Sequence, residues 1–310
     1  MTSKRGRGRR VMMWATPISA DCGGDPEVKI LFIGTGVGET VKIDDATMVA
    51  GHRPCAHQLL SGPPSILLEP DIRIDYSEDG PLGRFGVDEQ SVRHLVFTHG
   101  HTDHLLPRPL LAFAARQPHG LHLYGNNMVM DTIAFTATHT WDAERGRFHL
   151  QKNNADLCFH PVRAGDTFSV ANARFTALLS NHFVDQVHMI QGQQALNYVI
   201  EQGGKTLYYG LDSAYPLPET MEVLRHHRLD AAVFDAKGGA KEIDRKRGHM
   251  NFAIVDELVT ELRRAGTVTD DTVVLVSHLS PAPTEPFDEI AADMTARGLR
   301  LAYAGLRLEL

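Results

Sequence analysis

Cysteine is scarce in this sequence, with Cys22, Cys55 and Cys158 the only three among 310 residues. Their number is odd, they are widely spaced, and no pair forms a Cys-x-x-Cys motif. This pattern argues against the disulfide framework of a small secreted protein, and a chain of this length buries enough surface to fold without one. We therefore expect a protein of a reducing compartment, the cytoplasm.

Net positive charge and long apolar runs are missing as well. The formal net charge is −7 at pH 7, so no overall field attracts the protein to nucleic acid or to an anionic membrane. No run approaches the roughly 20 apolar residues that a membrane-spanning helix needs. We expect neither a membrane nor a nucleic acid as a partner. The sequence is compatible with a homodimer as well as with a monomer.

Basic residues do gather at the N-terminus, where residues 3–10 read SKRGRGRR. We interpret residues 1–27 as a flexible basic tail, with contact to RNA or phosphate as the alternative. The following segment, VMMWATPISA at 11–20, resembles a signal peptide only weakly, because its apolar stretch is short and contains Pro17. No linker or change of composition divides residues 28–310, so we predict one domain there.

The first half of this domain begins with a strand. Residues 28–36, VKILFIGTG, form an apolar run that ends in a glycine-rich turn, but the GxGxxG fingerprint of dinucleotide-binding proteins is missing. Short apolar runs predict further strands at 64–70, 72–76, 93–98 and 121–125. Helical spacing of apolar residues predicts helices at 101–117 and 126–141.

The second half is richer in strands at first and then alternates. Alternating apolar and polar residues predict strands within 156–182, and 195–213 is typical of a hairpin closed at Gly203–Gly204. The remaining predicted elements are helices at 218–228, 251–266 and 287–298, and strands at 230–236, 272–280 and 300–310. Two β-rich halves that helices cover predict an α/β sandwich.

Histidine is the residue in excess, with 17 in the chain, and the densest group is HGHTDH at 99–104. This segment directly follows a predicted buried strand. Residues two apart in an extended segment face the same way, so His99 and His101 can point together, while Asp103 and His104 turn with the next helix. Imidazole suits Zn, Mn or Fe, and carboxylate adds charge. The four side chains can therefore serve two metal ions on two faces.

Two metal ions need more ligands than this segment supplies. His182, Asp212 and His278 each follow an apolar β-run directly, as the HGHTDH segment does. Binding and catalytic residues often lie in loops that a rigid scaffold positions. We therefore predict that these three side chains join the first four, with His188 as the alternative to His182.

The motif and the order of the later ligands resemble those of the metallo-β-lactamase-fold hydrolases, over a span from about Val28 to about Leu306. The segment ILFIGTG, residues 30–36, resembles the opening strand and turn of the family's phosphodiesterase branch. The resemblance implies a four-layer αββα sandwich with a dinuclear site between two sheets. It also implies two divalent metal ions as cofactors, with Zn²⁺ or Mn²⁺ expected and Fe as the alternative.

Carried over to this sequence, the family's ligand set is His99, His101 and His182 for the first metal ion, Asp103, His104 and His278 for the second, and Asp212 as the bridge. Aspartate at the bridging position, where some β-lactamases of this fold have cysteine, fits phosphoester and lactone hydrolases. Metal ions about 3.5–4 Å apart can hold an attacking hydroxide and polarise a phosphoryl oxygen. Asp103 is expected to be a catalytic residue as well as a ligand.

A further histidine, His249 in RGHMNFAIVDEL, precedes a predicted helix. Its spacing to His278 resembles the branch that includes ribonuclease Z and the phosphoribosyl cyclic phosphodiesterases. The resemblance implies that His249 faces the substrate phosphate and protonates the leaving oxygen. Histidine suits this role because its ordinary pKa lies close to neutral pH. A helix-capping role is the alternative. Asp235, which ends another predicted strand, is expected to orient a neighbour by a hydrogen bond or to be a turn residue.

These features predict a dinuclear metal-dependent hydrolase that cleaves a small or cyclic phosphodiester by a hydroxide bridging the metal ions. Hydrolysis of a lactone or another carboxylic ester is the alternative. Processing of tRNA 3′ ends is less favoured, because the chain is acidic and has no long Pro/Gly-rich arm. A non-catalytic sensor is disfavoured, because a structural zinc site is closed and mononuclear.

Two segments, 37–62 and 136–160, are interpreted as insertions. The second contains His139, His149 and His160, which we expect either to line a substrate entrance or to be solvated.

Overall fold

The computed structural model of the protein describes residues 27–37, 62–77, 82–153, 155–183, 194–246, 248–280 and 287–310. Residues 1–26 of the predicted basic tail, most of the segment 37–62 and the alternative ligand His188 lie outside the described residues. Within the described part, no helix combines the length and the apolar character that crossing a membrane requires.

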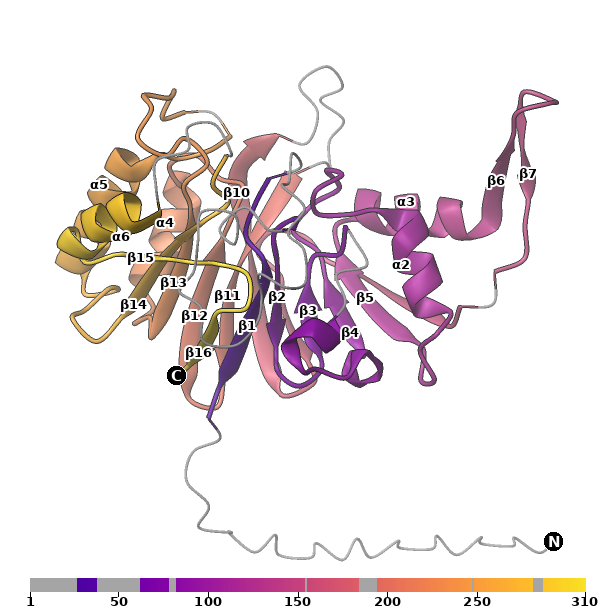
Figure 1. Ribbon diagram of the computed structural model, residues 1–310, viewed down its shortest axis with the longest axis horizontal. Coiled ribbons are helices and arrows are strands. Elements are labelled where there is room, and N and C mark those ends of the chain that lie inside the picture. The colour runs from indigo at the N-terminus through magenta and orange to yellow at the C-terminus, as the bar shows by residue number, and fades with distance from the viewer. Residues whose placement is uncertain are drawn as a thin grey trace, which may run out of the picture.

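Seven strands of the described part of the chain form the first sheet, in the order β16-β1-β2-β3-β4-β5-β8 (Figure 1). Their bounds are β1 Lys29–Gly34, β2 Ser65–Leu68, β3 Ile72–Ile74, β4 His94–Val96, β5 Leu121–Gly125, β8 Leu157–Pro161 and β16 Arg307–Glu309. Pairing is antiparallel from β16 to β3 and parallel from β3 to β8. The carboxyl ends of the parallel strands therefore meet at one edge of the sheet.

The second sheet also has seven strands, in the order β15-β14-β13-β12-β11-β10-β9. Their bounds are β9 Thr167–Val170, β10 Ala173–Phe183, β11 Gln194–Gln202, β12 Lys205–Gly210, β13 Ala231–Asp235, β14 Val273–Ser277 and β15 Arg300–Leu301. Strands β12 to β15 are parallel to one another. The predicted hairpin between β11 and β12 is confirmed, and Gly203 and Gly204 close it with φ angles of 54° and 76°, which favour glycine.

Within the described residues, five helices cover the outer faces of the two sheets (Figure 1). Their bounds are α2 Pro107–Ala114, α3 Asn127–Thr138, α4 Pro218–Arg225, α5 Phe252–Ala265 and α6 Phe287–Ala296. Two 3₁₀ turns, Leu82–Phe85 and Glu89–Ser91, precede β4. Helices α2 and α3 pack on the first sheet, and α4, α5 and α6 pack on the second. The side chains of Asn126 and Asn251 cap the first turns of α3 and α5, as their residue type favours.

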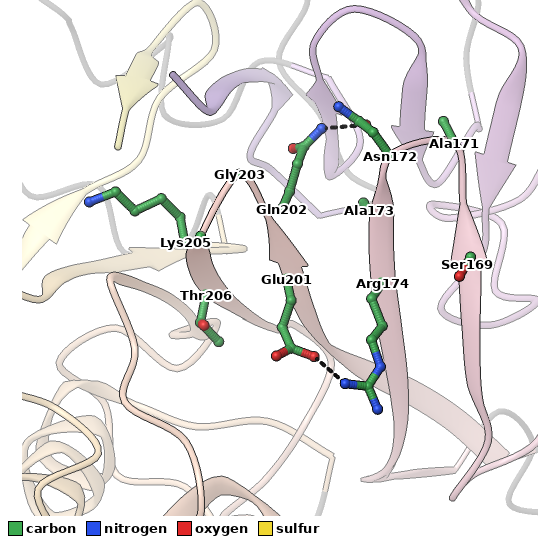
Figure 2. A pocket seen from close by; sticks show the side chains of 11 residues that line it. Ser169, Ala171, Asn172, Ala173, Arg174, Glu201, Gln202, Gly203, Lys205 and Thr206 are labelled. Atoms are coloured by element: carbon green, nitrogen blue, oxygen red, sulfur yellow. Dashed lines mark hydrogen bonds and ion pairs between the residues drawn. The ribbon is translucent and has the colours of Figure 1, made fainter. Parts of the chain in front are cut away.

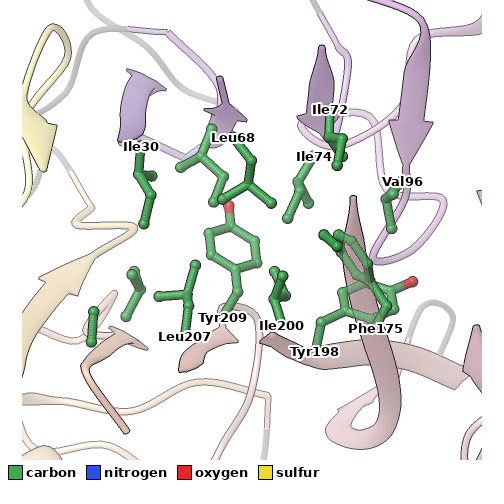
Figure 3. Close-up of a cluster of buried hydrophobic side chains, with 14 of the residues drawn as sticks. Ile30, Leu68, Ile72, Ile74, Val96, Phe175, Tyr198, Ile200, Leu207 and Tyr209 are labelled. Carbon is green, nitrogen blue, oxygen red and sulfur yellow. The ribbon is translucent and has the colours of Figure 1, made fainter. Parts of the chain in front are cut away.

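The main core lies between the two sheets, and Figure 3 shows its centre. Inward-facing side chains of the first sheet meet those of the second, namely Ile30, Leu68, Ile72, Ile74 and Val96 against Phe175, Tyr198, Ile200, Leu207 and Tyr209. Side chains alternate along β1, so that Ile30 and Phe32 enter this core while Leu31 and Ile33 pack beneath α2 and α3. The four layers are helix, sheet, sheet and helix, which confirms the predicted αββα sandwich.

Three predicted elements differ from the structure. The helix predicted at 101–117 begins only at Pro107, because residues 101–106 form the turn that carries the histidine-rich motif. The helix predicted at 126–141 ends at Thr138, and the chain continues into a hairpin of β6 (His139–Asp142) and β7 (Arg147–Leu150) that projects from the body (Figure 1). The strand predicted at 300–310 is two short strands, which belong to different sheets.

Candidate metal centre and active site

The predicted ligands lie at one end of the sandwich, where strands of both sheets end. The segment 99–104 follows β4 of the first sheet. His182 lies near the end of β10, Asp212 follows β12, and His278 follows β14 of the second sheet. Because β12 and β14 run parallel with β13 between them, their carboxyl ends meet at the same edge. The structure thus brings all seven predicted ligands together.

Three imidazoles form the first cluster. Nδ1 of His101 lies 2.9 Å from Nε2 of His99 and 3.1 Å from Nε2 of His182. Nδ1 of His182 is 2.9 Å from the carbonyl oxygen of Gly248, which can only accept, so His182 donates there and its Nε2 carries the lone pair. Burial lowers the pKa of His182 to about 4, so this imidazole is neutral at pH 7. Three imidazole nitrogens that converge in this way suit a metal cation, which histidine binds in its neutral form.

Two imidazoles and two carboxylates form the second cluster. Nε2 of His104 lies 2.6 Å from Oδ2 of Asp212, and Nε2 of His278 lies 3.5 Å from Oδ2 of Asp103 and 3.6 Å from Oδ2 of Asp212. The other oxygen of Asp212, Oδ1, lies 3.6 Å from Nε2 of His182. The two oxygens of Asp212 therefore face different clusters, which is the arrangement a bridging carboxylate needs.

The fit of this centre to cations rests on buried atoms without a proper partner. Nε2 of His104, Nε2 of His278 and Oδ2 of Asp212 are buried, and none makes a well-aligned hydrogen bond within the described residues, although they lie close together. Buried polar atoms in this situation are costly unless a partner such as a bound ion satisfies them. Nitrogen and carboxylate oxygen donors suit Zn, Mn and Fe. The residues present therefore fit two divalent cations.

Backbone strain concentrates at the same place. Four described residues other than glycine have a positive φ, and three of them, Asp75, Asp212 and His278, lie at this centre, with φ of 60°, 45° and 63°. The fourth is Ala171, in the turn between β9 and β10. Such conformations cost on the order of 1–3 kcal/mol each and persist where the surroundings fix them, as functional sites do.

Asp75 is a site residue that sequence reasoning missed. It is fully buried, and its carboxylate accepts hydrogen bonds from the backbone N–H and the hydroxyl of Thr98, both at 2.8 Å. Its Oδ2 also lies 2.7 Å from Nδ1 of His104, which turns Nε2 of that ring towards the cluster. Carboxylates that orient a ligating imidazole in this way raise its basicity and fix its tautomer. Asp75 directly follows β3, just as the predicted ligands follow their strands. This position is the signal in the sequence that could have identified Asp75 as a site residue.

Asp235 supports the centre from the second sheet. Its Oδ2 accepts from the backbone N–H of Asp212 at 3.1 Å and from Nδ1 of both His249 and His278, at 2.9 and 3.0 Å. Its Oδ1 accepts from two further backbone N–H groups, those of Lys237 and Met250. The predicted role of Asp235 in orienting neighbours is confirmed by these contacts.

His249 lies in the turn before α5, on the open side of the centre. Its ring is 4.9 Å from that of His182 and 5.4 Å from that of His278, between centroids, and its side chain is 21% exposed. The capping alternative is wrong, because Asn251 caps this helix. Nε2 of His249 lies 3.2 Å from Nζ of Lys237, a residue that the sequence reasoning did not single out.

The carboxylates dominate the electrostatics of the second cluster. Burial disfavours the charged form of His278, but the carboxylates of Asp212, Asp103 and Asp235 outweigh it and raise its pKa to about 9. His104, fully buried between Asp212 and Asp75, likewise has its pKa held well above the usual range. Divalent cations would balance the same negative charge, and ligands must give up their protons to bind them.

Other predicted candidates lie elsewhere. His139 and His149 are on the projecting β6–β7 hairpin, and His160 is on β8 at the far side of the first sheet. The hollow in Figure 2 is also separate, because it lies at the opposite end of β10 and β12 from the metal centre. Its polar side chains pair with one another, Arg174 with Glu201 and Gln202 with Asn172.

Comparison with known proteins places the chain in a family. The family described as "Beta-lactamase superfamily domain" matches residues 79–278, which is more than half of the chain. The chain belongs to this superfamily, and it is a metal-dependent hydrolase of the metallo-β-lactamase fold. A search of curated protein sequences found no match.

Several solved structures share the fold at low sequence identity. The metallo-β-lactamase fold protein YhfI from Bacillus subtilis aligns with a TM-score of 0.65 and 16% identity, over 92% of this chain and 100% of that one. A diphosphatase from the PhnP family aligns with a TM-score of 0.64 and 18% identity, over 91% and 98%. Human tRNase Z, short form, aligns with a TM-score of 0.57 and 13% identity, over 90% and 98%. At these identities the likeness shows the fold.

Proposed function

We propose that the protein hydrolyses a small or cyclic phosphodiester at two divalent cations, Zn²⁺ or Mn²⁺, with Fe as the alternative. The observation that carries the proposal is the convergence of the seven predicted ligands into two clusters that the carboxylate of Asp212 joins. In this proposal His99, His101 and His182 hold one cation, and Asp103, His104 and His278 hold the other. The PhnP-family diphosphatase and tRNase Z, which share the fold, act on phosphate esters or anhydrides by their names, and this supports the choice of substrate class.

The cations, when bound, supply a hydroxide nucleophile at neutral pH and neutralise charge on the phosphoryl oxygens. The residues do the remaining work. Asp103, whose side chain is 15% exposed, is the ligand carboxylate that a substrate and its attacking water can reach. It is suited to orient that water by accepting its hydrogen bond.

His249 is suited to deliver a proton to the leaving oxygen. Its Nδ1 donates to Asp235 at 2.9 Å, which leaves Nε2 on the open side, 3.2 Å from the Lys237 ammonium. An ammonium has donors only, so Nε2 accepts in this contact. In this contact Nζ of Lys237 holds the proton, and Nε2 of His249 can take it up and pass it to the leaving oxygen, after which solvent reprotonates the lysine. The lysine charge also attracts an anionic substrate.

Hydrolysis of a lactone or another carboxylic ester remains the second candidate, because the same cations polarise a carbonyl oxygen. The contact between Lys237 and His249 favours the phosphodiester, whose anionic oxygens gain from a cation beside the proton donor. For the partners and location we propose a small phosphorylated substrate, no nucleic acid, and the cytoplasm, on the charge and cysteine content of the sequence.

The test is hydrolysis of bis(p-nitrophenyl) phosphate by purified protein loaded with Mn²⁺ or Zn²⁺, in parallel with a panel of lactones. We expect the wild-type protein to hydrolyse the phosphodiester and the variant Asp212→Ala to lose this activity. Lactone turnover without phosphodiester turnover would support the second candidate instead. Folded protein that carries both metal ions and cleaves neither substrate would contradict both.

A further inference from the structure

A second group of metal-binding side chains lies on the first sheet, away from the centre described above. Nδ1 of His122 on β5 lies 3.0 Å from Nε2 of His160 on β8. Sγ of Cys158, also on β8, completes a group of three donor atoms that all lie within 4.8 Å of one another. Cys158 is a free, exposed cysteine. Two imidazoles and a thiol in such proximity are a typical ligand set for zinc and similar cations.

The sheet register holds these three side chains on one face. His122 is the direct partner of Cys158 across the parallel pair β5–β8, and Tyr124 is the partner of His160. Residues two apart in a strand share a face, so both residues of β8 point the same way as His122. The ring of Tyr124 stacks on His160, with centroids 4.4 Å apart and an angle of 11°, and fixes that imidazole in place.

The same row continues on β4. His94 is the register partner of His122, and their ring centroids are 5.2 Å apart. Nδ1 of His94 is buried and has no hydrogen-bond partner within the described residues. Burial lowers the pKa of both His94 and His160, and the charge that neighbouring imidazoles would carry lowers them further. His94 and His160 are therefore neutral nitrogen donors, and Nδ1 of His94 is unused.

The position of this group separates it from the catalytic end. His94 begins β4, whereas the HGHTDH segment follows the end of that strand, five residues later. At about 3.3 Å per residue along a strand, the two groups are roughly 16 Å apart. The group also connects β5 to β8, which is the edge strand of the first sheet. A cation here would join the edge strand to the rest of the sheet without reaching the substrate.

We propose that His122, Cys158 and His160 form an accessory site for a single thiophilic divalent cation of the Zn²⁺ or Co²⁺ type. On binding, the thiol of Cys158 loses its proton to solvent, and the thiolate and two imidazole nitrogens become three ligands of the cation. Water supplies the fourth. The site is independent of the hydrolase centre and does not rest on the proposed reaction.

Cobalt spectroscopy of the reduced, metal-free full chain tests this site, because a thiolate bound to Co²⁺ gives a near-ultraviolet charge-transfer band. The dinuclear centre has only nitrogen and oxygen ligands, so it contributes no such band. We expect the band in the wild-type protein and in the control variants Cys22→Ser and Cys55→Ser, and its loss in Cys158→Ser. His122→Gln and His160→Gln should each weaken Co²⁺ binding at this band at least tenfold.

Zinc content and activity give a second measurement. Cys158→Ser should retain one Zn²⁺ fewer per chain than the wild type, while the hydrolytic activity of the metal-loaded variant stays the same. No band in the wild type, a band that survives in Cys158→Ser, or a band indifferent to both histidine variants would each overturn the proposal. These results do not depend on whether phosphodiesters are cleaved.

Discussion

Changing Asp235 to Asn keeps the size of the side chain and removes its charge, and we expect this change to weaken both the metal centre and the fold. The carboxylate is fully buried and accepts five hydrogen bonds, two at Oδ1 and three at Oδ2. An amide has one acceptor oxygen and an NH₂ group that only donates. Whichever way the amide turns, at least two buried N–H groups lose their acceptor.

The magnitude follows from these contacts. A buried donor left without an acceptor costs about 1–3 kcal/mol, so the variant should lose roughly 2–6 kcal/mol of unfolding free energy. An NH₂ group facing Nδ1 of His278 and His249 also favours the tautomer with the proton on Nε2. For His278 this is the nitrogen that faces the cation. Loss of such an orienting partner typically lowers metal affinity about 10–100-fold.

Asp230→Asn is the matched control, because Asp230 lies just before the other end of the same strand β13. It accepts from the backbone N–H of Thr206 at 2.8 Å and from Nζ of Lys205 at 3.3 Å, and it is partly exposed. Its loss should cost no more than about 1 kcal/mol and leave metal binding unchanged. Urea denaturation and chelator competition measure the two effects. If Asp235→Asn matches Asp230→Asn in both assays, the reasoning about Asp235 is refuted.

Three further predictions concern single side chains. His249→Ala should lower kcat for the phosphodiester by about 10²–10⁴-fold with both metal ions retained, and a parallel loss of metal would contradict a role in proton transfer. Lys237→Met should reduce kcat/KM for the phosphodiester about 10–100-fold and spare lactone turnover, whereas equal loss on both substrates would argue against phosphate attraction. Tyr209→Phe should raise the free energy of unfolding by about 1 kcal/mol, because the buried hydroxyl of Tyr209 has no partner in the described part of the chain. Tyr198→Phe should lower the free energy of unfolding by about the same amount, because the hydroxyl of Tyr198 donates to the carbonyl of Phe97 at 2.6 Å. Shifts of the same sign in urea unfolding would contradict this contrast.

The sequence identified site residues where polar side chains directly follow a buried apolar strand. Largely buried apolar runs such as β14 lead directly into polar residues, and polar side chains at those points are conspicuous. This rule located His99, His182, Asp212 and His278. The same rule applies to Asp75, but one aspartate after a strand of three residues cannot be told from an ordinary turn residue.

Other features depend on information that a local pattern does not carry. The β6–β7 hairpin has no buried face, since Trp141, Phe148 and Leu150 are all exposed, and so it leaves no periodicity to recognise. The helix predicted from residue 101 begins six residues later, at Pro107, a residue type that favours the first position of a helix. The group of His122 and His160 depends on the register of two strands whose histidines are 38 residues apart, and register is set by tertiary packing.

The most direct test of the central claim is anomalous diffraction from crystals grown with Zn²⁺ or Mn²⁺. We predict two peaks about 3.5–4 Å apart at the catalytic end, both in contact with the carboxylate of Asp212. One peak should lie among the nitrogens of His99, His101 and His182, and the other should lie next to Asp103. A single peak at this end, or no peak in contact with Asp212, would contradict a dinuclear hydrolase centre.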